Sequence, residues 1–202
     1  MTLRDYQQAA VKAANQAWCE GLGRVVWSMA TGTGKTVAFA AVAERALRAS
    51  RRVLILAHRE ELIQQAADKL GAFAPWARDL VGVVKAERDE WEAQCVVASV
   101  QSLQGARLER YEPGAFSLVI VDECHHAAAP SYRAILDHLQ APYVLGVTAT
   151  PKRGDGVGLH EVFARVVYTY ALQDGIRDGH LCDVRQFTIE TDTDLDGVAT
   201  RA

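Results

Sequence analysis

The chain has 202 residues, half of them hydrophobic, and a net charge of −3. This length suits one α/β domain with a sizeable core, and the charge excludes a protein that attracts nucleic acid over its whole surface, so any such site must be local. There is no membrane-length apolar run and no signal peptide, and the four cysteines form no Cys-x-x-Cys pair. We therefore expect a cytoplasmic protein with buried or incidental thiols.

The predicted elements alternate between helices and strands. An amphipathic helix is expected from residue 3 to about 18, ended by Gly21 and Gly23. Apolar runs typical of strands buried on both faces of a parallel sheet occur at 25–29, 53–57, 79–84, 94–100, 116–121 and 143–147. Helices are expected between them, at 36–49, 58–73, 102–110 and 130–139, with a surface turn at 85–92. This alternation predicts an α/β fold with a mainly parallel central sheet and helices on both faces.

The C-terminal part predicts a basic loop at 152–156, a short helix at 159–163, a strand at 166–170, a helix at 171–178 and a strand at 182–189. The remaining residues are acidic and polar and have no visible core partner. We therefore expect one domain over 1–188, with 189–202 as a polar tail that begins a missing region or a linker.

A glycine loop separates the first expected strand from the second helix. Its glycines let the backbone curl so that N–H groups point at phosphate oxygens, and the helix start adds the positive end of its dipole. Lys35 would reach the β- and γ-phosphates, and Thr36 would place its hydroxyl on Mg²⁺. The strict pattern has a glycine where this chain has Met29. On these residues alone, a chance turn before a helix is the alternative. The candidate phosphate-binding residues are Thr31, Gly32, Thr33, Gly34, Lys35 and Thr36.

Two adjacent carboxylates, Asp122 and Glu123, follow the strand expected at 116–121. A buried strand that ends in two charges needs a partner, and Mg²⁺ is the obvious one. Asp122 would hold the ion, and Glu123 would orient and deprotonate an attacking water. A charged loop after a strand is the alternative. His125 and His126 lack a third ligand at a useful spacing, which disfavours zinc.

Three further candidates lie near these motifs. Arg4 and Gln7 share a face at the start of the first helix, and a glutamine amide can pair with the N6/N7 edge of adenine. Two polar residues on a solvated face are the alternative. Thr148 and Thr150 end the sixth strand, where they can bond to the carboxylates or to His125.

Taken in order, these motifs resemble the first RecA-like lobe of a superfamily 2 helicase of the DExH type, over nearly the whole chain. Arg4 and Gln7 match its adenine-reading motif, residues 30–36 its motif I and 122–125 its motif II in a DECH form. Residues 148–150 match motif III, so the resemblance implies that His125, Thr148 and Thr150 couple the ATP state to the grip on nucleic acid. ATP and Mg²⁺ are the implied cofactors.

The resemblance also implies contacts with a nucleic-acid backbone. Residues 57–62 resemble motif Ia, and 99–102 resemble the strand-binding motif that follows it. The implied contact residues are His58, Arg59, Ser99 and Gln101. The loop at 29–36 and the stretch 148–156 are more similar to DNA-directed members, such as Rad25-type repair helicases and motor subunits of type I restriction enzymes, than to DEAD-box RNA proteins.

One departure from the family pattern is large. The family's motor has two lobes, and the second supplies arginines that stabilise the transferring phosphoryl group. No second lobe is visible in this sequence, so we expect a fragment, or a half-motor completed by another chain, that is inactive or weak as an ATP hydrolase alone. The alternatives are a module that binds nucleotide or nucleic acid without turnover, and the lobe of an RNA helicase. A P-loop kinase is disfavoured because it needs neither the DECH nor the Thr-Ala-Thr segment.

Overall fold

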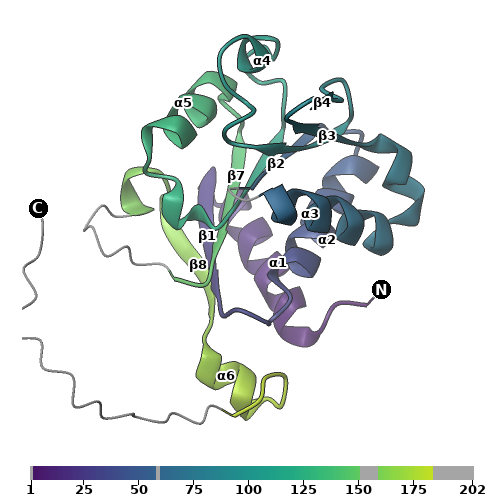
Figure 1. Ribbon diagram of the computed structural model, residues 1–202. Helices are drawn as coiled ribbons and strands as arrows, with labels where there is room; N and C mark the ends of the chain where they lie inside the picture. Colours follow the sequence, from purple (N-terminus) through teal and green to yellow (C-terminus); the bar gives the residue numbers. More distant parts are fainter. Residues whose placement is uncertain (1, 58–59, 151–158, 184–202) are drawn as a thin grey trace, which may run out of the picture.

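An eight-stranded sheet in the order β4-β3-β5-β2-β6-β7-β1-β8 organises the chain (Figure 1). The computed structural model describes residues 2–57, 60–150 and 159–183. β3 and β4 pair antiparallel, and the other neighbours pair parallel, which confirms the predicted fold class. The strands are β1 (Arg24–Met29), β2 (Val53–Ala57), β3 (Val81–Lys85), β4 (Arg88–Asp89), β5 (Cys95–Ser99), β6 (Leu118–Asp122), β7 (Tyr143–Thr148) and β8 (Arg165–Tyr170).

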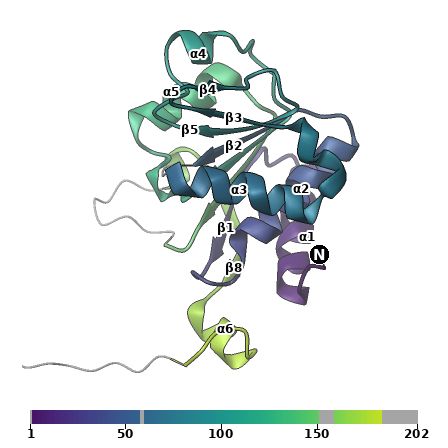
Figure 2. The same cartoon turned by 45° about the vertical axis from the view of Figure 1, so that its right-hand side comes forward.

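Helices cover both faces of this sheet (Figures 1 and 2). The α-helices are α1 (Asp5–Cys19), α2 (Lys35–Arg48), α3 (Glu60–Phe73), α4 (Ala106–Glu109), α5 (Pro130–Leu139) and α6 (Leu172–Arg177). The 3₁₀-helices are η1 (Pro75–Leu80), η2 (Cys124–His126) and η3 (Leu159–Glu161). Alternate strand residues face opposite layers: Ile55 and Ile120 pack with α1, α2 and α3, whereas Leu54 and Val119 pack with α4 and α5. Burial on both faces explains why the strands are apolar without alternation.

Some predicted boundaries differ from the structure. The helix expected at 102–110 is a single turn, α4, because Ser99 holds the preceding chain in a turn: its carbonyl oxygen accepts hydrogen bonds from the backbone nitrogens of Ser102 and Leu103. The third strand begins at Val81 rather than residue 79, because η1 takes up the residues before it. The surface turn expected at 85–92 contains the short strand β4.

Several predicted features fall outside the described residues. They are His58, Arg59, the basic loop at 152–156, and the tail at 189–202. Of the strand expected at 182–189, Cys182 and Asp183 are described and are not in a strand. Within the described ranges, no helix combines the length and the apolar character that crossing a bilayer would require.

Parallel pairing brings the ends of three strands to one edge of the sheet. β7 lies between β1 and β6, and its Thr148 pairs in register with Ser28, two residues before Ala30. On its other side, Val147 pairs with Asp122. The glycine loop, the two carboxylates and residues 148–150, the threonine segment, therefore leave the sheet side by side, although they are far apart in sequence.

Candidate functional site

The glycine loop connects β1 to α2 in a conformation that requires its glycines. Gly32 and Gly34 have φ angles of +84° and +74°, a region that favours glycine. A Cβ atom on Gly34 would lie 2.7 Å from Nε2 of Gln7. The side chain of Thr33 is buried, and its hydroxyl donates to the carbonyl oxygen of Ala30 at 2.6 Å, which closes the loop on itself. Lys35 and Thr36 begin α2 and are partly exposed, as residues that bind phosphate and Mg²⁺ would have to be.

Helix α1 supports this loop from the side. Gln7 is buried, and its Nε2 donates to the carbonyl oxygens of Thr33 at 3.1 Å and of Gly34 at 3.4 Å. Its Oε1 accepts from the backbone nitrogen of Arg4 at 3.0 Å. Gln7 is therefore next to the glycine loop, but both ends of its amide are engaged within the protein. Adenine recognition by Arg4 and Gln7 stays a prediction.

The carboxylates lie at the end of β6. Asp122 is buried, and burial followed by the nearby charge of Glu123 raises its pKa to about 6. The backbone N–H of Glu123, which donates to Oδ1 of Asp122 at 3.1 Å, and the charge of Lys35 act in the opposite direction. The charge of Lys35 therefore lowers the pKa of Asp122 from the neighbouring loop. Glu123 has φ 49° and ψ 50°, a left-handed conformation that is uncommon outside glycine and frequent at functional sites.

A side-chain hydrogen bond joins the DECH segment to the threonine segment. Nδ1 of His125 lies 3.0 Å from Oγ1 of Thr148 and 3.3 Å from Oε2 of Glu123. The hydroxyl of Thr148, which is fully buried, also donates to the carbonyl oxygen of Thr150 at 3.2 Å and accepts from its N–H at 3.1 Å. The three residues predicted to couple ATP state to nucleic-acid grip therefore form one chain of contacts that ends on Glu123.

The residues predicted to contact nucleic acid differ in their exposure to solvent. Gln101 is exposed at the end of β5, where a backbone phosphate could reach it. Ser99 is buried, and its hydroxyl donates to Oγ of Ser102 at 2.8 Å and accepts from the N–H of that residue at 3.0 Å. The hydroxyl of Ser99 therefore holds a turn, and a contact of this residue with nucleic acid stays a prediction. His58 and Arg59 lie outside the described residues.

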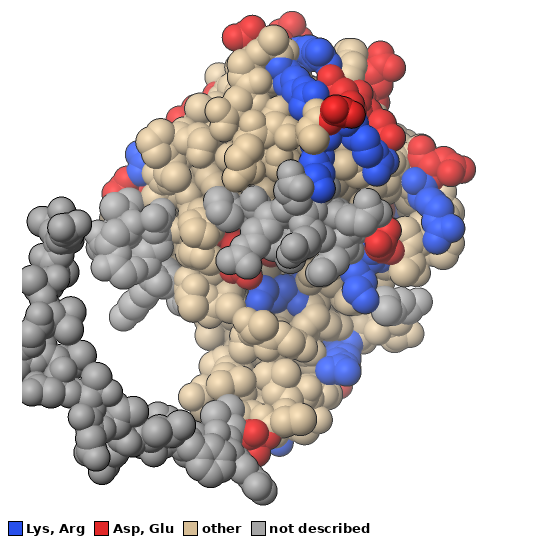
Figure 3. Space-filling view, in the orientation of Figure 1, with Lys and Arg blue, Asp and Glu red and all other residues tan. Residues whose placement is uncertain are grey.

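Charge on the neighbouring surface is mixed. Basic and acidic side chains gather together over β3, β4 and α4, at the top of the view in Figure 3. Asp89 forms ion pairs with Arg107 and Arg110, and Glu90 forms one with Arg88. These arginines are thus partly neutralised by their neighbours, so the described residues of this surface carry charges of both signs.

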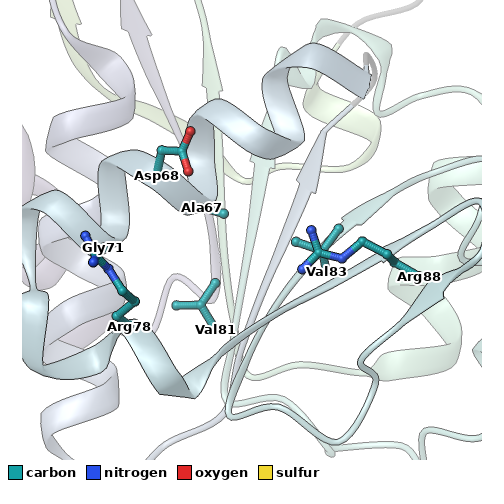
Figure 4. Close-up of a pocket in the computed structure, with 7 residues that line it drawn as sticks. All are labelled: Ala67, Asp68, Gly71, Arg78, Val81, Val83 and Arg88. Carbon is teal, nitrogen blue, oxygen red and sulfur yellow. The ribbon is translucent and has the colours of Figure 1, made fainter.

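Two cavities differ in their relation to the site. A cavity of about 440 Å³ adjoins the glycine loop and the threonine segment; its lining residues are Ser28, Ala30, Thr31, Ala149, Thr169, Tyr170, Ala171 and Leu172. Another, of about 400 Å³, lies between α3 and β3, with Arg78, Arg88 and Asp68 around an apolar floor (Figure 4). No residue of the glycine loop or of the DECH segment lines the second cavity, so that cavity is separate from the predicted phosphate site.

The donor set near the loop fits Mg²⁺ rather than a metal held wholly by protein. Among the described residues, no three His, Cys, Asp or Glu side chains lie together as a metal site. Mg²⁺ usually takes one or two protein ligands and completes its shell with waters and substrate phosphates. The raised pKa of Asp122 indicates a buried carboxylate that a cation would stabilise.

Sequence reasoning missed two aromatic residues beside the loop. Tyr6 is buried, donates its hydroxyl to the carbonyl oxygen of Thr33 at 2.7 Å, and stacks on Tyr170 with ring centroids 4.1 Å apart. Further along, Leu181 would contact a Cβ atom on Gly32 at 3.1 Å. The signal for Tyr6 was its place next to Gln7 at a helix start, but nothing in the sequence pairs it with a residue 164 positions later.

Comparison with known proteins agrees with this geometry. Residues 1–153 match the family described as the type III restriction enzyme, res subunit. The chain is 35% identical to IRC3 of Saccharomyces cerevisiae, whose name assigns it to the ATP-dependent helicases, with 99% of this chain and 31% of that protein covered. It is 32% identical to the type I restriction enzyme EcoAI endonuclease subunit of Escherichia coli, with 96% of this chain and 25% of that protein covered.

Solved structures show the same likeness. A fragment assigned as an HsdR subunit of a type I restriction enzyme from Vibrio vulnificus YJ016 superposes with a TM-score of 0.68 at 30% identity, covering 87% of this chain and 32% of that chain. The Hef helicase domain of Pyrococcus furiosus superposes with a TM-score of 0.69 at 24% identity, covering 87% and 39%, and shows the fold alone. The chain spans about a third or less of the two curated relatives and of the HsdR fragment. From the family match and the fold together, the chain belongs to the type III restriction enzyme res-subunit family and corresponds to the first RecA-like lobe of a superfamily 2 helicase.

Proposed function

We propose that this lobe binds ATP with Mg²⁺ and serves, together with a second RecA-like lobe, as the motor of a DNA helicase or translocase. The observation that carries the proposal is the meeting of the glycine loop, Lys35 and the buried carboxyl of Asp122 at one edge of the sheet. This arrangement puts phosphate-binding backbone, a cation for the β- and γ-phosphates and a ligand for Mg²⁺ in one place.

Each residue has a separate role in the proposed site. Lys35 pairs with the terminal phosphates, and Thr36 and Asp122 hold Mg²⁺, directly or through water. The ion, when bound with ATP, neutralises charge on the phosphoryl oxygens. Glu123 orients the attacking water and accepts its proton. His125 contacts Glu123 and Thr148 together, so a movement of the threonine segment can reach the catalytic carboxylate.

The second lobe enters for a chemical reason. Phosphoryl transfer in this class needs an arginine that stabilises the transition state, worth about 10³- to 10⁵-fold in rate. The relatives are about three to four times longer than the matched region, which leaves room for such a lobe. We therefore propose weak or absent turnover for these 202 residues alone and full turnover only in a two-lobed protein.

DNA is the proposed track. Two kinds of observation support it: the restriction-enzyme family that matches the chain, and the relatives that are restriction-enzyme subunits. Contacts through Gln101 and through the region of Arg59 would be to phosphate and sugar, so the grip should show little sequence preference. RNA as the track, and a lobe that binds without turnover, are the alternatives.

The test is steady-state ATP hydrolysis with Mg²⁺, in the presence of duplex DNA, single-stranded DNA, RNA or no nucleic acid. It uses the 202-residue chain and a longer protein that carries the same lobe followed by a second one. Hydrolysis by the two-lobed protein that DNA stimulates and RNA does not would support the proposal. Stimulation by RNA alone would show that the motor acts on RNA instead of DNA. No hydrolysis by the two-lobed protein under any condition would reject the motor function.

A further inference from the structure

The carbonyl oxygen of Thr33, inside the glycine loop, receives two side-chain donors from helix α1. The hydroxyl of Tyr6 donates to it at 2.7 Å, and Nε2 of Gln7 donates to it at 3.1 Å. Nε2 of Gln7 also lies 3.4 Å from the carbonyl oxygen of Gly34. The first turn of α1 thus fixes two successive carbonyl groups of the loop, and the shorter of these bonds comes from Tyr6.

Because the peptide group is planar, the hydrogen bonds to these carbonyl groups also fix the direction of the loop N–H groups. In a trans peptide the C=O and N–H groups lie in one plane and point in opposite directions, and none of the described peptides is cis. Holding the Thr33 carbonyl toward α1 therefore directs the Gly34 N–H away from α1. The bond to the Gly34 carbonyl directs the Lys35 N–H in the same way. Backbone N–H groups of such a loop are the groups that bind phosphate oxygens.

We infer that Tyr6 is a positioning residue for nucleotide binding: its hydroxyl holds the Thr33–Gly34 peptide in the orientation that presents the loop N–H to phosphate. This inference rests on the proposed function, because it assumes that the loop binds a triphosphate. It assigns Tyr6 to the phosphates rather than to the base. Loss of the hydroxyl should consequently weaken every triphosphate ligand to the same extent, whatever its base.

The surroundings of Tyr6 make the role specific to its hydroxyl. Its ring stacks on Tyr170, at an interplanar angle of 2°, and packs near His180. Removing the hydroxyl alone should leave this stack in place. Tyr170 offers a matched control, because its ring belongs to the same stack while its own hydroxyl donates to Oδ2 of Asp178 at 2.9 Å, away from the loop carbonyls.

The experiment compares Tyr6→Phe with Tyr170→Phe in the 202-residue chain, with Lys35→Ala as the reference for loss of the site. Calorimetric titrations with Mg²⁺ measure the affinity for ATP, GTP and inorganic tripolyphosphate. We expect Tyr6→Phe to weaken all three by about 3- to 10-fold, the range for loss of one neutral hydrogen bond. We expect Tyr170→Phe to change each by less than about 2-fold, since it removes no bond to the loop.

A second measurement is made on the nucleotide-free chain. ¹⁵N relaxation reports the mobility of the backbone amides of Gly32, Thr33 and Gly34. We expect Tyr6→Phe to increase the mobility of these amides and Tyr170→Phe to leave it unchanged. A general loss of folding in Tyr6→Phe would instead increase the mobility of amides throughout the sheet.

The outcomes separate the inference from the proposed function. Unchanged affinities together with unchanged loop mobility in Tyr6→Phe would overturn the inference, and weaker ATP with normal GTP and tripolyphosphate would assign Tyr6 to the base instead. If the wild-type chain and Lys35→Ala bound triphosphates equally, the proposed function would fall. The relaxation data would still decide whether Tyr6 orders the loop.

Discussion

Nδ1 of His125 lies 3.0 Å from the hydroxyl of Thr148, which joins the DECH segment at the end of β6 to the threonine segment at the end of β7. The same nitrogen lies 3.3 Å from a carboxylate oxygen of Glu123. One imidazole therefore bridges the proposed catalytic carboxylate and the strand next to it. A shift of the end of β6 or of β7 can therefore move the other through the contacts of His125.

Thr148→Val should destabilise the chain, because it removes a fully buried hydroxyl that bonds to His125 and to the backbone of Thr150. Leaving such partners unsatisfied costs about 1–3 kcal/mol of the free energy of unfolding. Urea unfolding measures it. Thr148→Ser keeps the hydroxyl and is the matched control; equal stability of the Val and Ser variants would show that the hydroxyl bonds contribute nothing.

Gly34→Ala should be more harmful than Gly21→Ala, although both glycines have positive φ. A Cβ at Gly21 meets nothing within 4 Å, so that variant pays only the backbone strain, about 1 kcal/mol. A Cβ at Gly34 would lie 2.7 Å from Nε2 of Gln7 and must displace it from the loop. We expect a lower melting temperature and weaker ATP binding for Gly34→Ala, and normal binding for Gly21→Ala. Equal effects in both assays would contradict the role of Gln7 as a support of the loop.

The metal-free chain should become less stable as pH rises from about 4 to about 6. The pKa of Asp122 is raised to about 6 in the fold by burial and by Glu123, and an unfolded aspartate titrates near 3.9. Over that interval the folded state binds more protons than the unfolded state, so stability falls with pH. Above pH 6, ionisation of buried Asp122 lowers the free energy of unfolding by on the order of 2–3 kcal/mol.

Asp122→Asn removes this cost and keeps an acceptor for the Glu123 N–H. In EDTA at pH 7.5 the variant should unfold at a higher urea concentration than wild type, and the advantage should disappear near pH 4. Asp79→Asn, at an exposed carboxylate, is the control. A variant that is less stable than wild type at both pH values would show that ionised Asp122 is already compensated without a metal.

Glu123→Gln should leave ATP affinity within about 2-fold of wild type and stop turnover in a two-lobed protein, because the amide cannot accept the proton of the attacking water. The loss should be about 10²- to 10⁴-fold in kcat. Glu112→Gln changes an exposed carboxylate before β6 and is the control. Hydrolysis by the Glu123 variant at the wild-type rate would exclude this residue as the base.

The sequence predicted the parts of the fold that depend on local pattern. Unbroken apolar runs such as 53–57 predicted the inner strands, because strands buried on two faces have no polar alternation. The glycines before Lys35 predicted the loop, because positive φ angles favour glycine. What it could not predict depends on partners far away in the chain. The stack of Tyr6 on Tyr170 and the burial of Ser99 in its turn are set by packing across the sheet.

ATP binding by the 202-residue chain, measured by calorimetric titration with Mg²⁺ for wild type and Lys35→Ala, tests the central claim most directly. Lys12→Ala, which removes an exposed lysine of α1, is the control for general loss of positive charge. Our account predicts saturable binding by wild type and Lys12→Ala, and affinity lower by about 30- to 100-fold in Lys35→Ala, as expected for loss of a charge-assisted contact with phosphate. Equal affinity in all three proteins would contradict the assignment of the glycine loop as the nucleotide site.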